Sequence, residues 1–333
     1  FENCSSLTGI NIPSGVKYIQ DACFDGCVSL TSCVIPDGVE FLGWRIFQGC
    51  SALKHVDYPS GIDYIPIGMF EDCVCLSDFT IPDHITSIDS HAFYGCTGLK
   101  TIVIPQGAKA GVNAFTLCTG LTKATIPGNW NEIPAGLFAY CSSLSEIVFS
   151  SEFKIQTIGS DAFKGTAIKD LSPFSTAGSA KDSAFAECTG LVSLTVPENW
   201  DNEGYLYPSN PRTYTGPEYL FAGCTNLKTV SFSEKIHKIG GSWFFNCTSL
   251  TEITIPAHIS GIFADCFRRC SNLRTVSIMN SDTWFSTSCF SECNAIDTIN
   301  YAGTVAEWNE RNLSSYFDSE HYTVHCTDGE IVK

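Results

Sequence analysis

The sequence predicts an α/β solenoid in which about thirteen short coils stack on one another. Three observations predict it: a cysteine returns mostly every 23 residues, a phenylalanine stands three residues before each anchor position, and a leucine stands three residues after it in eleven coils. A fixed period of this length is typical of repeat proteins, because a single unit cannot cover its own apolar side and must stack on its neighbours. The 333 residues are therefore expected to form one extended array.

Two columns of side chains are expected to run through the stack. The anchor cysteines are Cys4, Cys27, Cys50, Cys73, Cys96, Cys118, Cys141, Cys188, Cys224, Cys247, Cys270 and Cys293, and Thr166 takes this position in the remaining coil. The phenylalanines are Phe1, Phe24, Phe47, Phe70, Phe93, Phe115, Phe138, Phe163, Phe185, Phe221, Phe244, Phe267 and Phe290. We expect packed thiols and core rings, because cysteine is small and among the most buried residue types. One cysteine per coil also has no partner in its own coil for a disulfide or a metal.

Each coil is expected to hold two short apolar segments and a closing turn. Apolar residues stand three and five positions after the leucine, as do Ile102 and Ile104 after Leu99, which predicts a strand. Proline follows in eight coils and ends the strand, since it has no N–H for the ladder. A second apolar pair, such as Ile85 and Ile88, precedes an A-F-x-x-C segment that we expect to form one helical or 3-10 turn. Strands of successive coils should then form a continuous parallel sheet.

Composition narrows the classes of function. The net charge is −16 and only 16% of the residues are charged, so the chain lacks the clustered basic residues that nucleic acid or anionic lipid requires. No apolar run approaches the roughly 20 residues of a membrane span, so no membrane insertion is expected of this chain. The sequence begins inside a repeat, at Phe1, and we therefore expect an export signal and further sequence upstream of it.

The repeat resembles the BspA-like class of leucine-rich repeat proteins. That class has the pattern L-x-x-I-x-I-P-x-x-[VI]-x-x-I-x-x-x-A-F-x-x-C, and residues 99–118 follow most of it. The resemblance covers roughly residues 1–301 and implies a right-handed, curved leucine-rich repeat array with a concave parallel β-sheet. It also implies display on the bacterial cell surface and a role in adhesion or protein binding.

The same resemblance suggests the domain organisation. The tail contains Y-A-G-T-V-A-E-W-N (301–309) and T-V-H-C-T-D-G (323–329), which are similar to the segment that often ends such arrays. We expect a solenoid over 1–301, with an insert at 198–216, and a C-terminal capping segment over 302–333. A cap is needed because the last coil would otherwise expose its apolar side.

Six cysteines lie outside the anchor column: Cys23, Cys33, Cys75, Cys266, Cys289 and Cys326. Cys266 and Cys289 take equivalent positions in neighbouring coils, about one strand spacing apart. A disulfide between these two therefore stays open, as does their oxidation state. The sequence has no C-x-x-C motif, and we predict neither a metal nor a cofactor.

The insert is the largest departure from the repeat, and it carries Trp200, Tyr205, Tyr207 and Tyr214, with prolines at 208 and 211 and another directly after it at 217. Aromatic side chains on a stiff backbone can contact a ligand at low entropic cost. Alternatively, these rings fold back and cover the flank of the solenoid. The sequence leaves both interpretations open.

The outward face of the strands is the second candidate surface. Its positions two and four after each leucine include His55, Asp57, Asp78, Glu146 and Glu252. Curved repeat proteins usually bind on such a face. In register, His55 would neighbour Asp78, but two or three ligands without a supporting shell favour a solvated face over a metal site.

No catalytic motif is present, and no nucleophile stands beside a base in the pattern, so we expect no enzyme activity. The predicted function is a non-catalytic, cell-surface or secreted binding module with adhesin-like properties. Its partner would be a protein or glycoprotein, including one from a host. The alternative is a passive structural spacer of the cell envelope that displays other domains.

Overall fold

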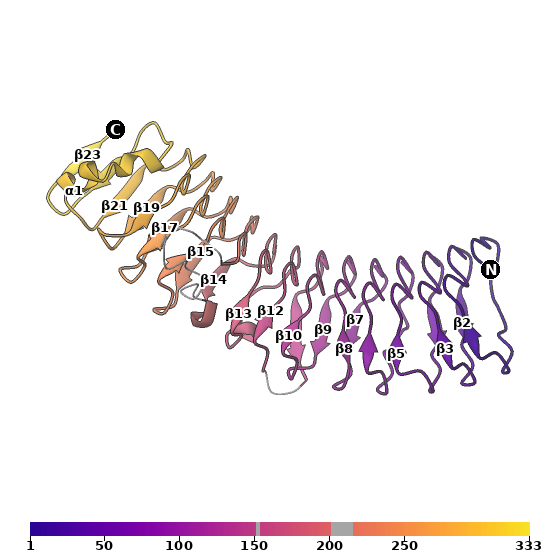
Figure 1. The fold of residues 1–333 in the computed structure, drawn as a ribbon. Coiled ribbons are helices and arrows are strands. Elements are labelled where there is room, and N and C mark those ends of the chain that lie inside the picture. Colours follow the sequence, from indigo (N-terminus) through magenta and orange to yellow (C-terminus); the bar gives the residue numbers. More distant parts are fainter. Residues whose placement is uncertain (151–153, 201–215) are drawn as a thin grey trace. The chain divides into compact units, whose positions relative to one another are not determined.

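A computed structural model describes residues 1–150, 154–200 and 216–333. These residues form a β-solenoid of about 13 turns with parallel strands and few helices, which confirms the predicted fold class. The chain divides into two compact units, Phe1–Ile168 and Lys169–Lys333. Figure 1 follows the coils of the first unit from indigo to magenta and those of the second unit on to yellow.

The first unit has two strips of short parallel strands. The strands after the anchor leucines are β2 (Ser32–Val34), β4 (His55–Asp57), β7 (Thr101–Val103), β9 (Lys123–Ile126) and β11 (Glu146–Phe149). The second strip consists of two-residue strands: β1 (Tyr18–Ile19), β3 (Phe41–Leu42), β5 (Tyr64–Ile65), β6 (Ser87–Ile88), β8 (Lys109–Ala110), β10 (Glu132–Ile133) and β12 (Thr157–Ile158). Strands pair with the equivalent strand of the next coil, as β7 does with β9 and β9 with β11.

The second unit repeats this plan. After η1 (Ser172–Phe174) and β13 (Ser179–Ala180), the first strip contains β14 (Ser193–Val196), β15 (Thr229–Phe232), β17 (Glu252–Ile255), β19 (Thr275–Ile278) and β21 (Thr298–Tyr301). The 3-10 turn η2 (Glu198–Trp200) follows β14, and the second strip contains β16 (Lys238–Ile239), β18 (Gly261–Ile262) and β20 (Trp284–Phe285). The chain ends in α1 (Val305–Glu310), η4 (Leu313–Tyr316), β22 (Thr323–His325) and the antiparallel β23 (Glu330–Val332).

The A-F-x-x-C segment closes each coil as a hydrogen-bonded turn. The N–H of Cys27 donates to the carbonyl of Phe24 over 3.1 Å, and the N–H of Phe24 donates to Ile46 of the next coil over 2.9 Å. Ala22 and Gly26 flank the turn with φ values of 53° and 69°, so each closure uses two left-handed residues. The segment therefore satisfies its backbone across coils instead of within a helix.

The phenylalanine column lies in the core of each unit. Neighbouring rings are nearly parallel, with centroids 5.4 Å apart for Phe24 and Phe47 and 5.1 Å apart for Phe93 and Phe115. Phe93, Phe115 and Phe138 are fully buried. Each ring thus packs against its equivalent in the next coil, which is why the residue recurs at a fixed position.

The cysteine column has a polar role besides packing. The thiol of Cys96 donates to the carbonyl of Phe70 over 3.0 Å, and that of Cys270 donates to Phe244 over 3.2 Å. Burial raises the pKa of the Cys247 thiol to about 12, so the sulfur keeps its proton and remains a donor. The fully buried anchor cysteines are Cys27, Cys50, Cys73, Cys96, Cys118, Cys141, Cys188, Cys224, Cys247, Cys270 and Cys293. These anchor thiols therefore give a carbonyl of the neighbouring coil a second donor, whereas the Thr166 hydroxyl donates to the Phe163 carbonyl of its own coil over 2.8 Å.

The expectation of one continuous sheet is wrong, because the strands form several short sheets. In the coil after β4, Phe79 takes the inward position that Ile102 takes in the next coil. Its ring packs 4.9 Å from Phe70 and 5.5 Å from Phe93. This coil has no strand among residues 77–80, and a larger ring in place of isoleucine accounts for the interruption.

The C-terminal residues continue the core of the second unit. Phe317 stacks on Phe290 at 4.9 Å, and the fully buried Trp308 stacks on Phe317 at 5.9 Å. A capping box between Thr304 and Glu307 starts α1. Across the ranges given above, no helix is long and apolar enough to cross a membrane.

Candidate binding surfaces

The outward side chains of the first strip form rows across neighbouring strands. In the first unit Thr101, Lys123 and Glu146 are register partners on β7, β9 and β11. Along β7, Ile102 is buried while Thr101 before it is exposed, as the alternation of side chains along a strand requires. Lys123 and Glu146 form an ion pair across strands. The row therefore presents polar groups that lie outside the apolar core.

His55 joins two coils on this surface. Its Nδ1 lies 2.9 Å from the Asp78 carbonyl oxygen and its Nε2 lies 2.8 Å from Asp57 Oδ1. Both partners are acceptors, so both ring nitrogens donate and the ring is assigned as imidazolium. The hydrogen bond to the Asp78 carbonyl, and then the bond to Asp57, raise the pKa of His55 above its usual 6.5. Neither nitrogen offers a lone pair to a metal in this arrangement.

Among the residues the structure describes, no three side chains of His, Cys, Asp or Glu gather as a metal site would require. His55 contacts the Asp57 carboxylate but only the backbone carbonyl of Asp78, its neighbour in the next coil. Glu146 and Glu252 lie on β11 and β17, in different units, and both are exposed. The candidate residues of the strand face thus belong to separate patches.

The insert residues have different positions. Trp200 is only 3% exposed, and its ring stacks on Phe185 at 5.6 Å and on Phe221 at 6.3 Å. It therefore belongs to the core and offers no surface to a ligand, because the phenylalanine column covers its ring. Tyr205, Tyr207 and Tyr214 lie outside the described residues.

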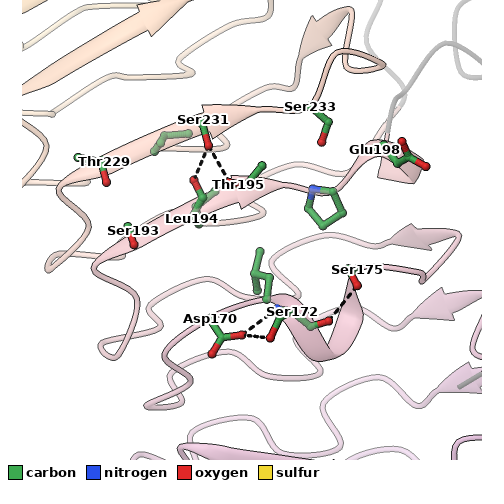
Figure 2. A pocket seen from close by; sticks show the side chains of 13 residues that line it. Asp170, Ser172, Ser175, Ser193, Leu194, Thr195, Glu198, Thr229, Ser231 and Ser233 are labelled. Carbon is green, nitrogen blue, oxygen red and sulfur yellow. Dashed lines mark hydrogen bonds between the residues drawn. The ribbon is translucent and has the colours of Figure 1, made fainter.

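A groove of 660 Å³ lies over β14 and β15 of the second unit. Figure 2 shows η1 beside β14, with the polar side chains of Ser172, Ser193 and Thr195 among those that line the groove. Hydroxyl groups dominate the lining, and the ionisable groups in it are acidic. The groove is lined by Asp170, Leu171, Ser172, Ser175, Ser193, Leu194, Thr195, Pro197, Glu198, Thr229, Val230, Ser231 and Ser233.

Local hydrogen bonds hold the walls of this groove. Asp170 Oδ1 accepts from the Ser172 backbone N–H over 2.9 Å, which fixes the start of η1. The hydroxyls of Thr195 and Ser231 lie 2.7 Å apart across β14 and β15. The repeat spacing places Ser193, Thr195, Thr229 and Ser231 on the outward face of the strands but does not predict a groove there. The available signals were the irregular coil after Thr166 and the proline at 173, inside η1.

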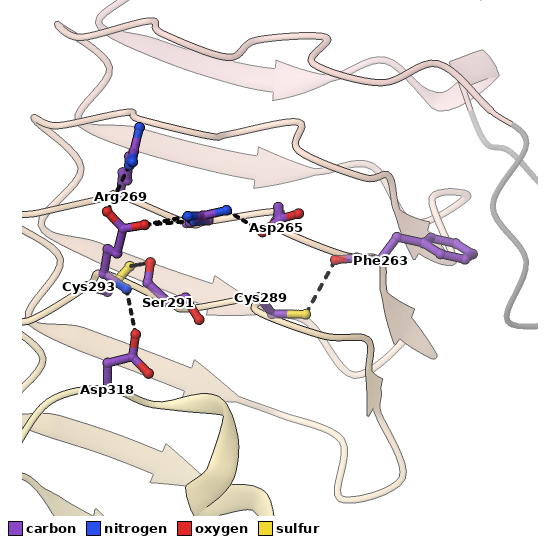
Figure 3. Close-up of polar contacts among 9 residues, drawn as sticks. Phe263, Asp265, Arg269, Cys289, Ser291, Cys293 and Asp318 are labelled. Atoms are coloured by element: carbon purple, nitrogen blue, oxygen red, sulfur yellow. Dashed lines mark hydrogen bonds and ion pairs between the residues drawn. The ribbon is translucent and has the colours of Figure 1, made fainter.

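A charged cluster on the second unit ties coils together. The Nη2 atom of Arg268 lies 2.6 Å from Glu292 Oε1, and Nε of Arg269 lies 2.8 Å from Glu292 Oε2. The backbone N–H of Glu292 donates to Asp318 Oδ2 over 2.8 Å (Figure 3). The bonds from Arg269 and then Arg268 lower the pKa of Glu292, so the carboxylate stays charged and bound. This cluster links successive coils of the second unit.

No disulfide joins the cysteines that the structure describes, including Cys266 and Cys289. The Cys289 thiol donates to the Phe263 carbonyl over 3.3 Å (Figure 3). Burial raises the pKa of Cys266 well above its ordinary value and that of Cys289 to about 12. Both thiols are therefore packed donors of low reactivity.

Comparisons with known proteins agree with this fold. A search of curated proteins found no match. A leucine-rich repeat protein from Bacteroides ovatus is similar in structure, with a TM-score of 0.66, 21% identity, and coverage of 96% of this chain and 92% of that one. A leucine rich cell surface protein from Faecalibacterium prausnitzii has a TM-score of 0.52 and 25% identity, and the coverage is 91% of this chain and 90% of that one.

The family model called BspA type leucine rich repeat region, which holds six copies, matches residues 1–110, 67–192 and 213–318. These matches include the anchor cysteines and phenylalanines that form the two core columns. By its repeat, its columns and this match, the chain belongs to the BspA-type leucine-rich repeat family.

Proposed function

We propose that the chain is a non-catalytic binding module, displayed on a cell surface or secreted, that holds a protein or glycoprotein partner in an adhesin-like role. The observation that carries the proposal is the row of exposed and half-buried side chains on the outward face of β7, β9 and β11. These side chains are in register and contribute nothing to the core. A flat row of threonine, valine and charged side chains suits a protein surface better than a small molecule, which needs a concave site.

The composition of the row supports this proposal. Val103 is 57% exposed and has Thr125 as its register partner, which in turn pairs with Val148. Val103 and Val148 thus lie beside charged side chains such as Lys123 and Glu146. Apolar contacts next to charged groups are typical of the core and rim of a protein interface. The cell-surface location of the Faecalibacterium prausnitzii protein supports a similar location here.

Binding to an array of purified mucins and extracellular-matrix proteins tests the proposal. We expect saturable binding of at least one of them, and the double variant Thr101→Arg/Thr125→Arg should weaken it more than tenfold, because two long charged side chains would cover the row. Ser14→Arg is the matched control, since Ser14 is exposed in a turn outside the row. It should bind as the unmodified chain does.

Thermal unfolding of the same variants separates binding from folding. Equal melting temperatures with a selective loss of binding support the proposal. Absence of binding to every protein on the array, with an intact fold, would overturn it in favour of a passive spacer. Equal binding by the double variant would move the interface away from β7, β9 and β11.

A further inference from the structure

The backbone of β14 has one edge that no neighbouring strand covers. Its other edge pairs with β15, where Leu194 is the register partner of Val230 and Thr195 that of Ser231. Within the described ranges, no backbone hydrogen bond joins β14 to the coil that carries η1. The edge beside η1 therefore presents unpaired backbone groups.

The direction of the neighbouring groups identifies which residues form this edge. The carbonyl of Val192 accepts from the N–H of Lys228 over 2.8 Å, and that of Val196 accepts from the Ser233 hydroxyl. Both carbonyls thus face β15. Because alternate residues of a strand direct their backbone groups to opposite sides, Ser193 and Thr195 direct theirs toward η1.

A proline explains why the edge is open. In coils that keep the strand, a backbone N–H near the end of the strand donates to the next coil. Ile104, five positions after the buried Leu99, donates in this way to the Thr125 carbonyl over 3.0 Å. Thr195 is the equivalent of Thr125. The coil of η1 is one residue shorter between its anchor, Thr166, and its first buried aliphatic residue, Ile168. Pro173 therefore stands five positions after Ile168, as Ile104 does after Leu99. Proline has no N–H to donate and sits in η1, which replaces the strand of this coil.

The groove described above opens at this edge. Asp170, Ser172 and Ser175 of the η1 coil form one wall, while Ser193 and Thr195 line it from β14. Asp170 and Glu198 are its ionisable groups, and both are exposed carboxylates. Glu198 already has an ion-pair partner in Lys235 at 3.1 Å, so Asp170 is the charge that remains for a ligand.

We propose that this edge of β14 binds an extended polypeptide segment of a partner, which adds as a strand and carries basic side chains toward Asp170. An extended backbone supplies the alternating donors and acceptors that Ser193 and Thr195 require, and a lysine or arginine complements the acidic lining. The inference gives the proposed binding module a second site, with a peptide as its ligand. It rests on the proposed function only in that both treat the chain as a protein-binding module.

The test uses the full chain and the peptide Lys-Thr-Lys-Val-Lys-Thr-Lys-amide, labelled with fluorescein at its N-terminus, in a fluorescence polarisation assay at moderate salt. We expect saturable binding. Thr195→Pro removes the edge N–H without breaking a ladder bond and should weaken binding about tenfold, the effect of losing one or two hydrogen bonds. Thr195→Val, the matched control, keeps the N–H and should bind as the unmodified chain does.

A second probe makes the result independent of how the variants fold. The same peptide with its central amides N-methylated keeps every lysine charge but cannot donate hydrogen bonds from those amides. It should bind the unmodified chain at least about tenfold more weakly. Equal binding of the methylated and unmethylated probes, or equal binding by Thr195→Pro and Thr195→Val, would overturn the proposal. In that case the peptide would bind only because its positive charge is attracted to an acidic protein.

These outcomes are separate from those of the proposed function. Thr101→Arg/Thr125→Arg changes the first unit and should leave binding of the peptide unchanged. Loss of matrix-protein binding in that variant with intact peptide binding would support both proposals. Intact matrix-protein binding beside a failed peptide assay would remove the β14 edge alone.

Discussion

Gly261 lies under the ring of Trp284, and this contact makes a sharp prediction about packing in the second strip. The two residues are register partners on β18 and β20. A Cβ atom at position 261 would lie 2.1 Å from Cε2 and 2.4 Å from both Cζ2 and Nε1 of Trp284. Carbon atoms in contact are normally about 3.5–4.0 Å apart, so the indole would have to move by more than about 1 Å.

The free-energy change of Gly261→Ala follows from that displacement. Overpacking of this kind costs about 1–3 kcal/mol. The ring would also lose part of its edge-on contact with Phe263, whose centroid lies 4.9 Å away, and such pairs contribute about 0.5–1.5 kcal/mol. We therefore expect a loss of about 2–4 kcal/mol in the free energy of unfolding of this region, measured by urea denaturation.

A double-mutant cycle isolates the contact. In a Trp284→Ala background the three atoms nearest to the new methyl group are gone, and Gly261→Ala should be neutral or stabilise by up to about 1 kcal/mol through the unfolded chain. Gly107→Ala is the matched control, because no atom lies within 4 Å of a Cβ built there. An equal cost of Gly261→Ala in both backgrounds, or a cost below about 0.5 kcal/mol beside Trp284, would refute the reasoning.

Three further predictions concern the two columns and the imidazolium. Phe93→Ala should lower the free energy of unfolding by about 3–5 kcal/mol, because it empties a fully buried ring site in the column; a loss below about 1 kcal/mol in urea denaturation would be inconsistent with that position. Cys96→Ala should lower the free energy of unfolding by about 1–3 kcal/mol, because the sulfur packing and its hydrogen bond are lost. Cys75→Ala, at an exposed position, should change it by no more than about 0.5 kcal/mol. Similar effects at both sites would contradict the buried cysteine column. The pKa of His55, followed by NMR, should lie above 6.5. Because folding raises this pKa, protonated His55 stabilises the fold fully below the unfolded pKa, and the stabilisation disappears as the pH rises through the folded pKa. A free energy of unfolding that rises with pH between these two pKa values, relative to His55→Gln, would have the wrong sign.

The two columns could be predicted from the sequence because each residue in them packs against its own equivalent. Phe93 meets Phe115, and the Cys118 thiol donates to the Phe93 carbonyl, so one spacing specifies both contacts. The same regularity predicted the strand after Leu99. A pattern repeated in every coil needs no knowledge of distant parts of the chain.

Very short elements, and features that occur only once, were not predictable in this way. The two-residue strands of the second strip, such as β6 (Ser87–Ile88), are too short to show alternation. The ring of Trp200 fills space beside Phe185 and Phe221, yet in the sequence it stands in an aromatic insert that also fits an exposed loop. The groove beside β14 depends on a missing donor at Pro173, and its shape depends on how η1 then folds.

The central claim is that coils stack through sealed columns of thiols and rings, and cysteine alkylation with peptide mapping by mass spectrometry tests it most directly. In the native protein iodoacetamide should label the exposed Cys4 and Cys75, while the fully buried anchor cysteines react only after denaturation. Rapid native labelling of Cys96 and Cys118, or disulfides between anchor cysteines, would contradict the account.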